Sequence, residues 1–235
     1  MTITMITVVT GAAGALGSEV VRVLLERGHH VAALGRPSKR LDALARPGSC
    51  LPIGLDLTSE PSWSSAVARI ESELGPITGG VLCAGGYAGG APVRTTSKDD
   101  GTYARMVEMN LGTVERSIHA LVPAMASRKN GSIVVIGSRV VERPWEGAGA
   151  AAYVASKSAA VAYALAAAAE LTNEFVRINA VLPSVIDTPA NRTAMPNADP
   201  LRWVAPESLA RVIAFLLSDE ARDVSGAAIP VYARA

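Results

Sequence analysis

Short runs of apolar, largely β-branched residues alternate with longer stretches of helical pattern along the whole chain. The runs, such as "VVIG" and "INAVL", are continuously hydrophobic, as expected for strands that helices cover on both faces of a parallel sheet. Regular β–α alternation predicts an α/β fold with a single doubly wound parallel sheet. The expected strands are Ile3–Thr10, His30–Leu34, Leu51–Leu55, Gly80–Cys83, Ser132–Gly137, Val176–Leu182 and Ala227–Val231.

Helices are expected between these runs. Ala15–Arg27 carries apolar residues on one face and is followed by Gly28, a typical helix C-terminal cap. The other expected helices are Pro61–Leu74, Asp100–Arg128 as one or two helices, Ala151–Leu171 and Pro206–Leu217. The chain shows no internal repeat or long linker, so residues 1–235 are predicted to form one domain that carries both cofactor and substrate sites.

Composition excludes several classes of protein. With 49% hydrophobic and 18% charged residues the chain is globular rather than disordered. A net charge of +1 without a basic block argues against a nucleic acid or an anionic membrane as partner. The N-terminus "MTITMITVVTG" lacks the charged region and cleavage site of a signal peptide, and polar residues such as Lys157 and Glu170 interrupt the alanine-rich helix. We therefore expect a soluble, cytoplasmic protein that acts on a small molecule.

Cysteine and histidine offer no metal chemistry. Cys50 and Cys83 do not make a disulfide framework, and no Cys-x-x-Cys or Cys/His cluster is present. The three histidines, His29, His30 and His119, share no ligand spacing, and we expect them in loops or on the surface.

A glycine-rich turn, "TGAAGALG", follows the first expected strand and opens the first helix. Gly11 permits a tight turn, Gly14 lets the backbone approach a pyrophosphate, and Gly17 lets the helix pack close to the strand. The phosphates are expected at the positive N-terminus of that helix. Because the glycines lie between a strand and an amphipathic helix, they predict dinucleotide binding.

The second strand ends in "VAALGRPSKR", where folds that bind NAD commonly carry an acidic residue. This chain has Gly35 there, followed by Arg36, with Lys39 and Arg40 nearby. A guanidinium binds a 2′-phosphate bidentately, whereas a carboxylate repels it. The alternative is that these cations form the solvated face of a short helix. We predict NADP(H) as the preferred cofactor, with NAD(H) as the alternative.

Tyr153 and Lys157 stand four residues apart near the start of the alanine-rich helix, in "AAYVASK". A helix places both on one face, although such pairs are common on solvated helices. Tyr163 in the same helix has no lysine four residues later and is interpreted as a packing residue. A nearby ammonium lowers the pKa of a phenol, so the pair predicts a proton donor tuned by Lys157.

With "TGAAGALG" and "YVASK" in this order, the chain resembles the short-chain dehydrogenase/reductase family over nearly its whole length. The resemblance implies a Rossmann-like fold and the catalytic residues Asn110 in "EMNLG", Ser138 at the end of "SIVVIGS", Tyr153 and Lys157. It also implies hydride transfer between a nicotinamide and a small ketone, aldehyde, imine or alcohol. Ser138 would bond the substrate oxygen, Lys157 would hold the nicotinamide ribose, and Asn110 would hold a relay water.

The resemblance extends to further cofactor contacts. Asp56 matches the acid that binds the adenine amino group, "CAGG" at 83–86 stands where the family has Asn-Ala-Gly, and "LPSVIDT" at 182–188 matches the segment that contacts the nicotinamide. The predicted cofactor residues are Thr10, Gly11, Gly14, Ala15, Leu16, Gly17, Gly35, Arg36, Asp56, Leu57, Cys83, Ala84, Gly85, Tyr153, Lys157, Pro183, Val185, Ile186 and Thr188. Cys83 replaces an asparagine and Ser184 a glycine of the family pattern, which predicts altered packing without loss of catalysis.

Two stretches, "LCAGGYAGG" (82–90) and "AVLPSVIDTPANRTAMPNADPLRW" (180–203), resemble the quinonoid dihydropteridine reductases of the same family. The short connection from Thr188 to Pro206 implies an open site suited to a flat substrate. Those enzymes have an acid in place of Gly35 and lack the serine at 138, so pterin reduction is the alternative activity. Candidate substrate contacts, besides Ser138, are Tyr87, Trp145, Met195 and Trp203, whose alternative role is core packing.

Two further expectations concern the molecule as a whole. A catalytically silent nucleotide-binding regulator is an alternative of another class, against which the intact set of Ser138, Tyr153 and Lys157 argues. Members of the family usually form dimers or tetramers through long helices, and the alanine-rich helix permits close approach of a second helix. We therefore expect a homodimer or homotetramer.

Overall fold

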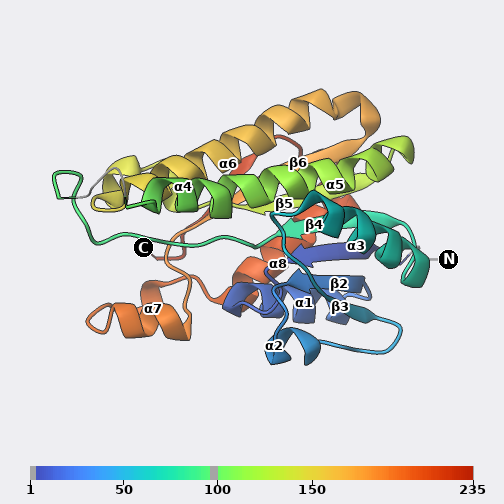
Figure 1. The fold of residues 1–235 in the computed structure, drawn as a ribbon, viewed down its shortest axis with the longest axis horizontal. Helices are drawn as coiled ribbons and strands as arrows, with labels where there is room; N and C mark the ends of the chain where they lie inside the picture. The colour runs from blue at the N-terminus through green and yellow to red at the C-terminus, as the bar shows by residue number, and fades with distance from the viewer. Residues whose placement is uncertain (1–3, 96–99, 235) are drawn as a thin grey trace.

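A seven-stranded parallel sheet forms the centre of the computed structural model, which describes residues 4–95 and 100–234 (Figure 1). The strand order is β3-β2-β1-β4-β5-β6-β7, with every neighbouring pair parallel. The strands are β1 (Ile6–Thr10), β2 (His30–Gly35), β3 (Cys50–Gly54), β4 (Ile77–Leu82), β5 (Gly131–Ile136), β6 (Val176–Pro183) and β7 (Ala228–Val231). The predicted doubly wound α/β fold is confirmed.

Helices cover both faces of this sheet (Figure 1). On one face lie α3 (Glu60–Glu73), α5 (Thr113–Ser127) and α6 (Ala151–Glu170), and on the other lie α1 (Ala15–Glu26) and α8 (Pro206–Leu217). Shorter helices are α2 (Lys39–Asp42), α4 (Thr102–Val107) and α7 (Pro189–Ala194). A π-helical turn, η1 (Glu108–Gly112), joins α4 to α5 without a break, so the stretch predicted at Asp100–Arg128 forms one continuous helical run.

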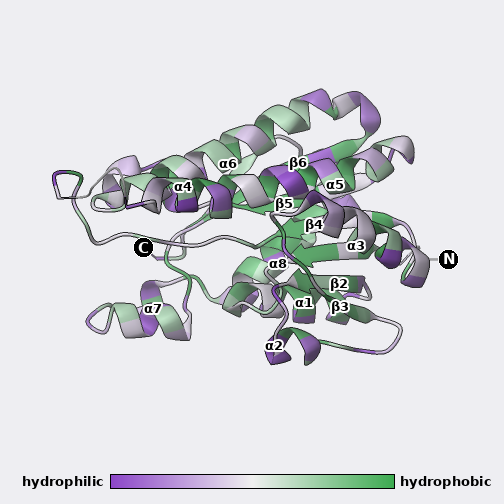
Figure 2. Ribbon diagram, viewed as in Figure 1, coloured by the Kyte–Doolittle hydropathy of each residue, from purple (hydrophilic) through white to green (hydrophobic). Residues whose placement is uncertain are grey.

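Successive strand residues supply two separate hydrophobic cores. Side chains alternate between the faces of a sheet, so Val8 packs under α3, α5 and α6 while Val9 packs under α1 and α8. Figure 2 shows the strands as mostly hydrophobic, whereas the helices also carry polar residues. The continuous apolar runs of the sequence therefore follow from burial on both faces.

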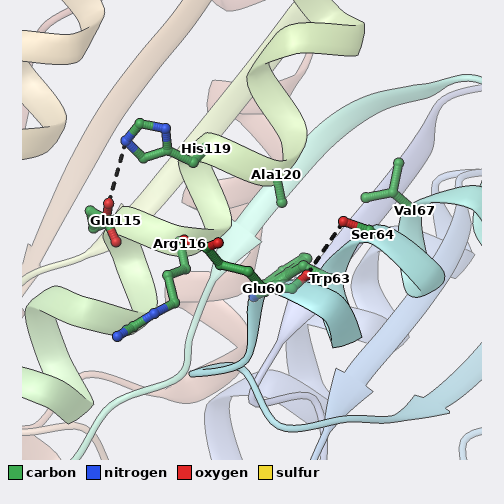
Figure 3. A pocket seen from close by; sticks show the side chains of 8 residues that line it. All are labelled: Glu60, Trp63, Ser64, Val67, Glu115, Arg116, His119 and Ala120. Carbon is green, nitrogen blue, oxygen red and sulfur yellow. Dashed lines mark hydrogen bonds and ion pairs between the residues drawn. The ribbon is translucent and has the colours of Figure 1, made fainter.

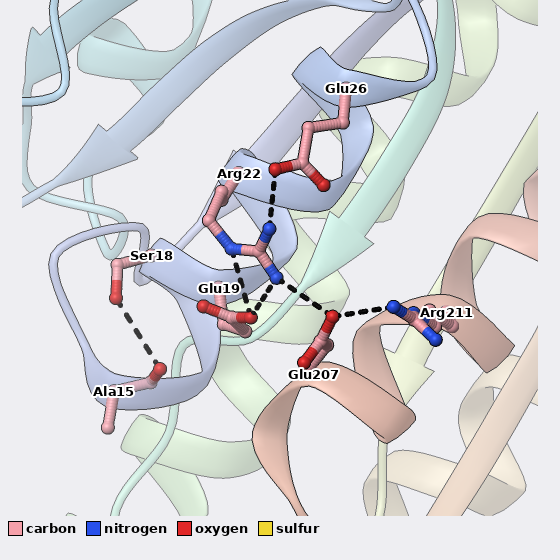
Figure 4. Close-up of polar contacts among 7 residues, drawn as sticks. All are labelled: Ala15, Ser18, Glu19, Arg22, Glu26, Glu207 and Arg211. Carbon is pink, nitrogen blue, oxygen red and sulfur yellow. Dashed lines mark hydrogen bonds and ion pairs between the residues drawn. The ribbon is translucent and has the colours of Figure 1, made fainter.

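The two helices of the second core also meet through surface charges. Arg22 on α1 lies 3.3 Å from Glu207 on α8 and is flanked by Glu19 and Glu26 on its own helix (Figure 4). Because these groups are substantially exposed, the pairs contribute little to stability compared with the apolar contacts beneath them.

Several predicted boundaries shift by one to three residues. β1 begins at Ile6 rather than Ile3, which lies outside the described residues. β4 begins at Ile77 instead of Gly80, and Gly79 is needed there because a Cβ would lie 2.6 Å from Thr7 Oγ1 on the neighbouring strand. Pro206–Leu217 is found as predicted. The short helices α2 and α7 were not predicted.

The three histidines were expected in loops or on the surface, but His30 lies in β2, while His29 lies in the loop between α1 and β2. Its side chain is buried, its Nδ1 lies 2.9 Å from Thr7 Oγ1, and burial lowers its pKa. His30 begins β2, and His119 is exposed on α5. A buried threonine hydroxyl requires a hydrogen-bond partner, and His29 provides it.

The alanine-rich helix α6 is long and apolar enough to cross a membrane by length and composition alone. In this fold it packs against β6 and α4 (Figure 1), and its first two turns bury Ser156 and Lys157. Its buried residues therefore pack within the fold, while about two thirds of its apolar window stays outside the core.

Candidate active site

Ser138 and Tyr153 come together at the carboxyl edge of the sheet, where open α/β sheets bind their ligands. Ser138 follows β5 and precedes a short 3₁₀ helix, η2 (Arg139–Val141), while Tyr153 lies in the first turn of α6. The Ser138 side chain is close enough to Tyr153 to lower the pKa of its phenol through hydrogen bonding. Two residues that the family pattern pairs are thus adjacent in space.

Lys157 lies one helical turn beyond Tyr153 and is buried. Its Nζ donates a hydrogen bond of 2.8 Å to the carbonyl oxygen of Ile136. Burial lowers its pKa to about 8. Burial in turn raises the pKa of Cys83 to about 12, which keeps that group a neutral thiol.

Tyr153 departs from the expectation that Lys157 lowers its pKa. Burial raises the pKa of the phenol, Tyr87 adds to that rise, and the hydrogen bond with Ser138 opposes it. The Lys157 ammonium is directed to the Ile136 carbonyl instead. The structure therefore holds Tyr153 as a protonated phenol at neutral pH.

Asn110 joins the turn after β4 to α6. It lies in the π-helical turn η1, a kind of distortion frequent at functional sites, and is fully buried. Its Oδ1 accepts a hydrogen bond from Gly86 N at 2.9 Å, while its Nδ2 donates to Gly86 O and Ser156 Oγ, each at 3.0 Å. Asn110 thus braces this turn, and its expected role in a water relay stays a prediction.

Gly85 allows Asn110 and Lys157 to approach the turn after β4. A Cβ on Gly85 would lie 2.7 Å from Asn110 Oδ1 and 3.2 Å from Lys157 Nζ. The third residue of "CAGG" therefore has no room for a side chain, and its predicted contact with the cofactor stays a prediction.

Tyr87 is the substrate candidate that the structure brings to Tyr153. The two rings meet edge to face with centroids 5.0 Å apart, and Tyr87 is 69% exposed. Trp145 is exposed in the 3₁₀ helix η3 (Pro144–Gly147), Met195 is half-buried after α7, and Trp203 is buried beside Val204. The substrate roles of these last three residues stay predictions.

The turn between β1 and α1 fits the pyrophosphate of a dinucleotide. Gly11 has a φ of +64°, and a Cβ there would lie 2.9 Å from Ala84 N. A Cβ on Gly17 would lie 2.2 Å from Gly11 O, whereas one on Gly14 would meet only Gly11 O, at 3.1 Å. The first turn of α1 carries no acidic residue and no capping side chain, so its N–H groups at Ala15, Leu16 and Gly17 face no competing anion.

Thr10 fixes this turn against the next strand by accepting a hydrogen bond from Ala84 N at 3.2 Å. At the end of β2, Gly35 is buried while Arg36, Lys39 and Arg40 are exposed. Lys39 and Arg40 belong to the short helix α2, as the solvated-face alternative holds, but Arg36 precedes that helix. Arg36 is therefore the cation of this group closest in sequence to the strand end.

The remaining predicted cofactor residues follow β3 and β6. Asp56 Oδ1 accepts hydrogen bonds from Thr58 N at 2.9 Å and Thr58 Oγ1 at 2.7 Å, which lower the pKa of this exposed carboxyl. Leu57 beside it is half-buried. Thr188 caps α7 by accepting a hydrogen bond from Asn191 N at 3.2 Å, so its hydroxyl already has a structural partner.

The two ends of the segment that follows Pro183 are joined by backbone hydrogen bonds. Ile186 pairs with Val204 in a parallel bridge, and Val204 N donates to Val185 O at 2.8 Å. Ser184, which replaces a glycine of the family pattern, donates from its hydroxyl to the carbonyl oxygen of Tyr232 at 2.8 Å. The substitution thus adds a contact to the C-terminus.

A separate groove of about 440 Å³ lies between α3 and α5 (Figure 3). It is lined by Glu60, Trp63, Ser64, Val67, Glu115, Arg116, His119 and Ala120. None of these is a predicted site residue. Among residues 4–95 and 100–234, no group of three or more His, Cys, Asp or Glu side chains could hold a metal ion.

Comparison with known proteins places the site in context. Residues 5–199 match the family model described as short chain dehydrogenase. The chain is 30% identical over 236 residues to the 3-oxoacyl-[acyl-carrier-protein] reductase FabG of Thermotoga maritima, covering 95% of this chain and 94% of that protein. It is 27% identical to the 2,5-dichloro-2,5-cyclohexadiene-1,4-diol dehydrogenase LinX of Sphingobium indicum, covering 96% and 94%. The crystal structure of gox2181 superposes with a TM-score of 0.89 at 29% identity, covering 97% and 94% of the two chains.

Proposed function

The chain belongs to the short-chain dehydrogenase/reductase family, and we propose that this NAD(P)-dependent oxidoreductase uses NADP(H) to reduce a small ketone, aldehyde or imine, or to oxidise the corresponding alcohol. The observation that carries the proposal is the placement of Ser138 after β5 beside Tyr153 in the first turn of α6, with Lys157 one helical turn away. Residues 1–235 would form one domain with both cofactor and substrate sites, in a cytoplasmic enzyme.

The cofactor and the protein have different parts in the reaction. A bound nicotinamide supplies or accepts the hydride, and the protein has to move the proton. Tyr153 donates it to the substrate oxygen in the direction of reduction, and the raised pKa of Tyr153 keeps that proton in place at neutral pH. The Ser138 hydroxyl hydrogen-bonds the same oxygen as charge develops on it.

The glycine turn would bind the dinucleotide through its pyrophosphate. The N–H groups of the first turn of α1 point to an anion site, since no acidic or capping side chain competes there. Arg36 at the end of β2 would bind the 2′-phosphate, which distinguishes NADP(H) from NAD(H). Lys157 would hold the nicotinamide ribose.

Tyr87 supports a substrate with a flat face. Its ring lies beside Tyr153 and is largely exposed, so a ring or planar carbonyl group bound at Tyr153 would contact it. FabG is named for 3-oxoacyl groups and LinX for a cyclohexadienediol, so related chains use both open-chain and cyclic compounds. Pterin reduction remains the alternative activity because Tyr87 could contact a flat ring, although the presence of Ser138, which the pterin reductases lack, favours carbonyl reduction.

The test is turnover by the purified protein with NADPH and a panel containing a 3-oxoacyl thioester, a cyclic ketone, an aryl aldehyde and quinonoid dihydropterin. We expect Tyr153→Phe to lower kcat by about 10²- to 10⁴-fold, the usual contribution of a general acid, while leaving NADPH affinity within about twofold. Tyr163→Phe, in the same helix, is the matched control and should retain wild-type kcat.

Three outcomes would redirect the proposal. Turnover of the pterin faster than that of every carbonyl would favour the pterin reductase. Binding of NADPH without turnover of the whole panel would favour a silent nucleotide-binding regulator. Unchanged kcat in Tyr153→Phe would remove the assigned proton donor.

A further inference from the structure

The last described residues of the chain, 231–234, contact the segments on both sides of the active site. We call these four residues the C-terminal tail. One set of contacts runs to residues 139–150, which join Ser138 to the helix that carries Tyr153. The other set runs to the segment that follows β6. The tail therefore lies between the two loops that flank the reacting groups.

Tyr232 makes the contacts to the first of these loops. Its hydroxyl donates a short hydrogen bond to the Glu142 carboxylate. Its ring faces two guanidinium groups, with the Arg143 and Arg139 carbons 5.3 Å and 5.9 Å from the ring centroid. The face of a phenol ring attracts cations, so one side chain engages three charged groups of the loop.

The same loop is closed by ion pairs around Glu146. Arg139 lies 2.7 Å and Arg143 3.2 Å from its carboxylate. Tyr232 thus contacts a loop that is already organised and fixes the position of that loop relative to the sheet. Burial and the Glu142 carboxylate raise the pKa of Tyr232 to about 12, so its hydroxyl remains a donor at neutral and mildly alkaline pH.

Backbone groups of the tail make the contacts to the second loop. Ser184 N donates to Val231 O at 3.2 Å, and the Ser184 hydroxyl donates to Tyr232 O at 2.8 Å. Further along, Arg202 Nε donates to Arg234 O at 3.1 Å, and Arg234 N donates to Arg202 O at 3.3 Å. The backbone of the C-terminal tail therefore binds the loop after β6. The Tyr232 side chain of the same tail binds the loop after β5.

We propose that Tyr232 is a positioning residue. It holds the 139–150 loop at a fixed position relative to the segment after β6 and so sets the affinity of the enzyme for its carbonyl substrate. The inference rests on the proposed function, because Ser138 and Tyr153 at the two ends of that loop are the groups that meet the substrate. Tyr232 itself touches neither of them. Its loss would leave the proton donor intact and loosen the surface on which the substrate rests.

The test compares Tyr232→Phe, which removes the hydroxyl and keeps the ring, with Tyr232→Leu, which removes both. We expect Tyr232→Leu to raise the substrate KM about tenfold and Tyr232→Phe about threefold, with kcat within threefold and the NADPH KM unchanged. Glu142→Gln should have an effect like that of Tyr232→Phe, and the double variant should add little to either. A control is Phe175→Leu, an exposed ring under Lys129 at the amino end of β6, which should leave all three constants unchanged.

A readout independent of activity separates this proposal from the proposed function. Amide hydrogen exchange in residues 139–150 should be at least fivefold faster in Tyr232→Leu than in wild type, without any ligand present. An active wild type whose Tyr232→Leu variant keeps its substrate KM within twofold would overturn the positioning role. If the wild type turns over no substrate, the proposed function fails, and unchanged exchange in 139–150 would then overturn the positioning role as well.

Discussion

At the scale of single residues, the site is dominated by a buried cation next to a protonated phenol. Lys157 is removed from water and donates a hydrogen bond to the backbone carbonyl of Ile136, so its positive charge is only partly compensated. Desolvation disfavours the charged form of a lysine, which explains the fall of its pKa from 10.5 to about 8. Such a shift couples the stability of the fold to pH.

We predict that burial of Lys157 destabilises the protein fully below about pH 8, where both the folded and unfolded states carry the proton. Between about pH 8 and 10.5 the unfolded state still binds the proton and the folded state does not, so the penalty shrinks as pH rises. Relative to Lys157→Met, the free energy of unfolding of the wild type should increase by about 2 kcal/mol between pH 7 and pH 10. Urea unfolding at both pH values measures this difference.

The exposed residue Lys129 provides the matched control for that experiment. Lys129→Met should give the same pH dependence of unfolding as the wild type. A wild type and Lys157→Met pair with parallel pH profiles would show that Lys157 keeps an ordinary pKa in the folded state.

Arg36 carries the prediction about the cofactor. Arg36→Ala should weaken NADPH binding by about 10- to 100-fold, the range expected for charge-assisted hydrogen bonds to a phosphate, and leave NADH binding unchanged. Arg40→Ala on α2 is the control and should have a smaller effect on NADPH. The dissociation constants are measured by calorimetry, and equal losses for NADPH and NADH in Arg36→Ala would remove the argument for NADP(H).

Local spacing was enough to predict that Tyr153 and Lys157 share a helix face, because four residues make about one helical turn. The direction of the Tyr153 pKa shift was beyond the sequence. It depends on burial of the phenol and on the neighbouring Tyr87 and Ser138, which only the tertiary fold brings to Tyr153. The hydrogen-bond partners of Asn110 could not be predicted for the same reason, because Gly86 and Ser156 are distant from it in the sequence.

At the scale of elements, two glycines of the turn between β1 and α1 have different roles, one in packing and one in ligand binding. Gly17 packs against Gly11 O and leaves no space for a Cβ, whereas Gly14 has room for one with a small adjustment. Gly17 is therefore required by the fold itself, whereas Gly14 is needed mainly so that the pyrophosphate can approach the backbone.

We therefore predict different consequences for two alanine substitutions in this turn. Gly17→Ala should destabilise the protein by about 2 kcal/mol or more, because the backbone has to shift to relieve the overlap. Gly14→Ala should change stability by less than about 1 kcal/mol and still weaken cofactor binding at least tenfold. Thermal unfolding and cofactor titration of both variants check this, and equal destabilisation by the two would contradict it.

Element boundaries were predictable where the sequence has a clear start signal. Pro206 occupies the first turn of α8, and the helix was found at the predicted residues because proline favours that position. The helices α2 and α7 have four and six residues, fewer than two turns, so they show no helical periodicity. β4 was predicted to begin three residues late because Gly79 has low strand propensity, whereas the close approach of Thr7 requires a residue without a side chain there.

At the scale of the whole molecule, α6 has an inner face on the sheet and an outer face of small residues. Ala155, Ala162, Ala166 and Ala169 are exposed at a spacing that places them on one side of the helix. Short-chain dehydrogenases are commonly oligomeric, and small side chains let two helices approach closely. We propose that this face contacts a second copy of the chain in a homodimer or homotetramer.

A charge on this face should weaken the assembly. We predict that Ala166→Arg lowers the molar mass in solution at least twofold relative to the wild type, because a buried unpaired guanidinium is costly at an interface. Light scattering after size-exclusion chromatography measures the mass. Ala45→Arg, an exposed position after α2, is the control, and an unchanged mass in Ala166→Arg would exclude this face as the contact.

The bridge between Ile186 and Val204 has a consequence for how this scaffold diversifies. The intervening residues begin and end at this bridge, which lies outside the seven strands, so the strands do not depend on the length of the intervening segment. The entropy of closing a loop grows only with the logarithm of its length, and doubling that length costs about 0.6 kcal/mol. Insertions and deletions here would be nearly neutral for folding, so the ligand range of such a chain can be rewritten during evolution while its proton-transfer apparatus is inherited unchanged.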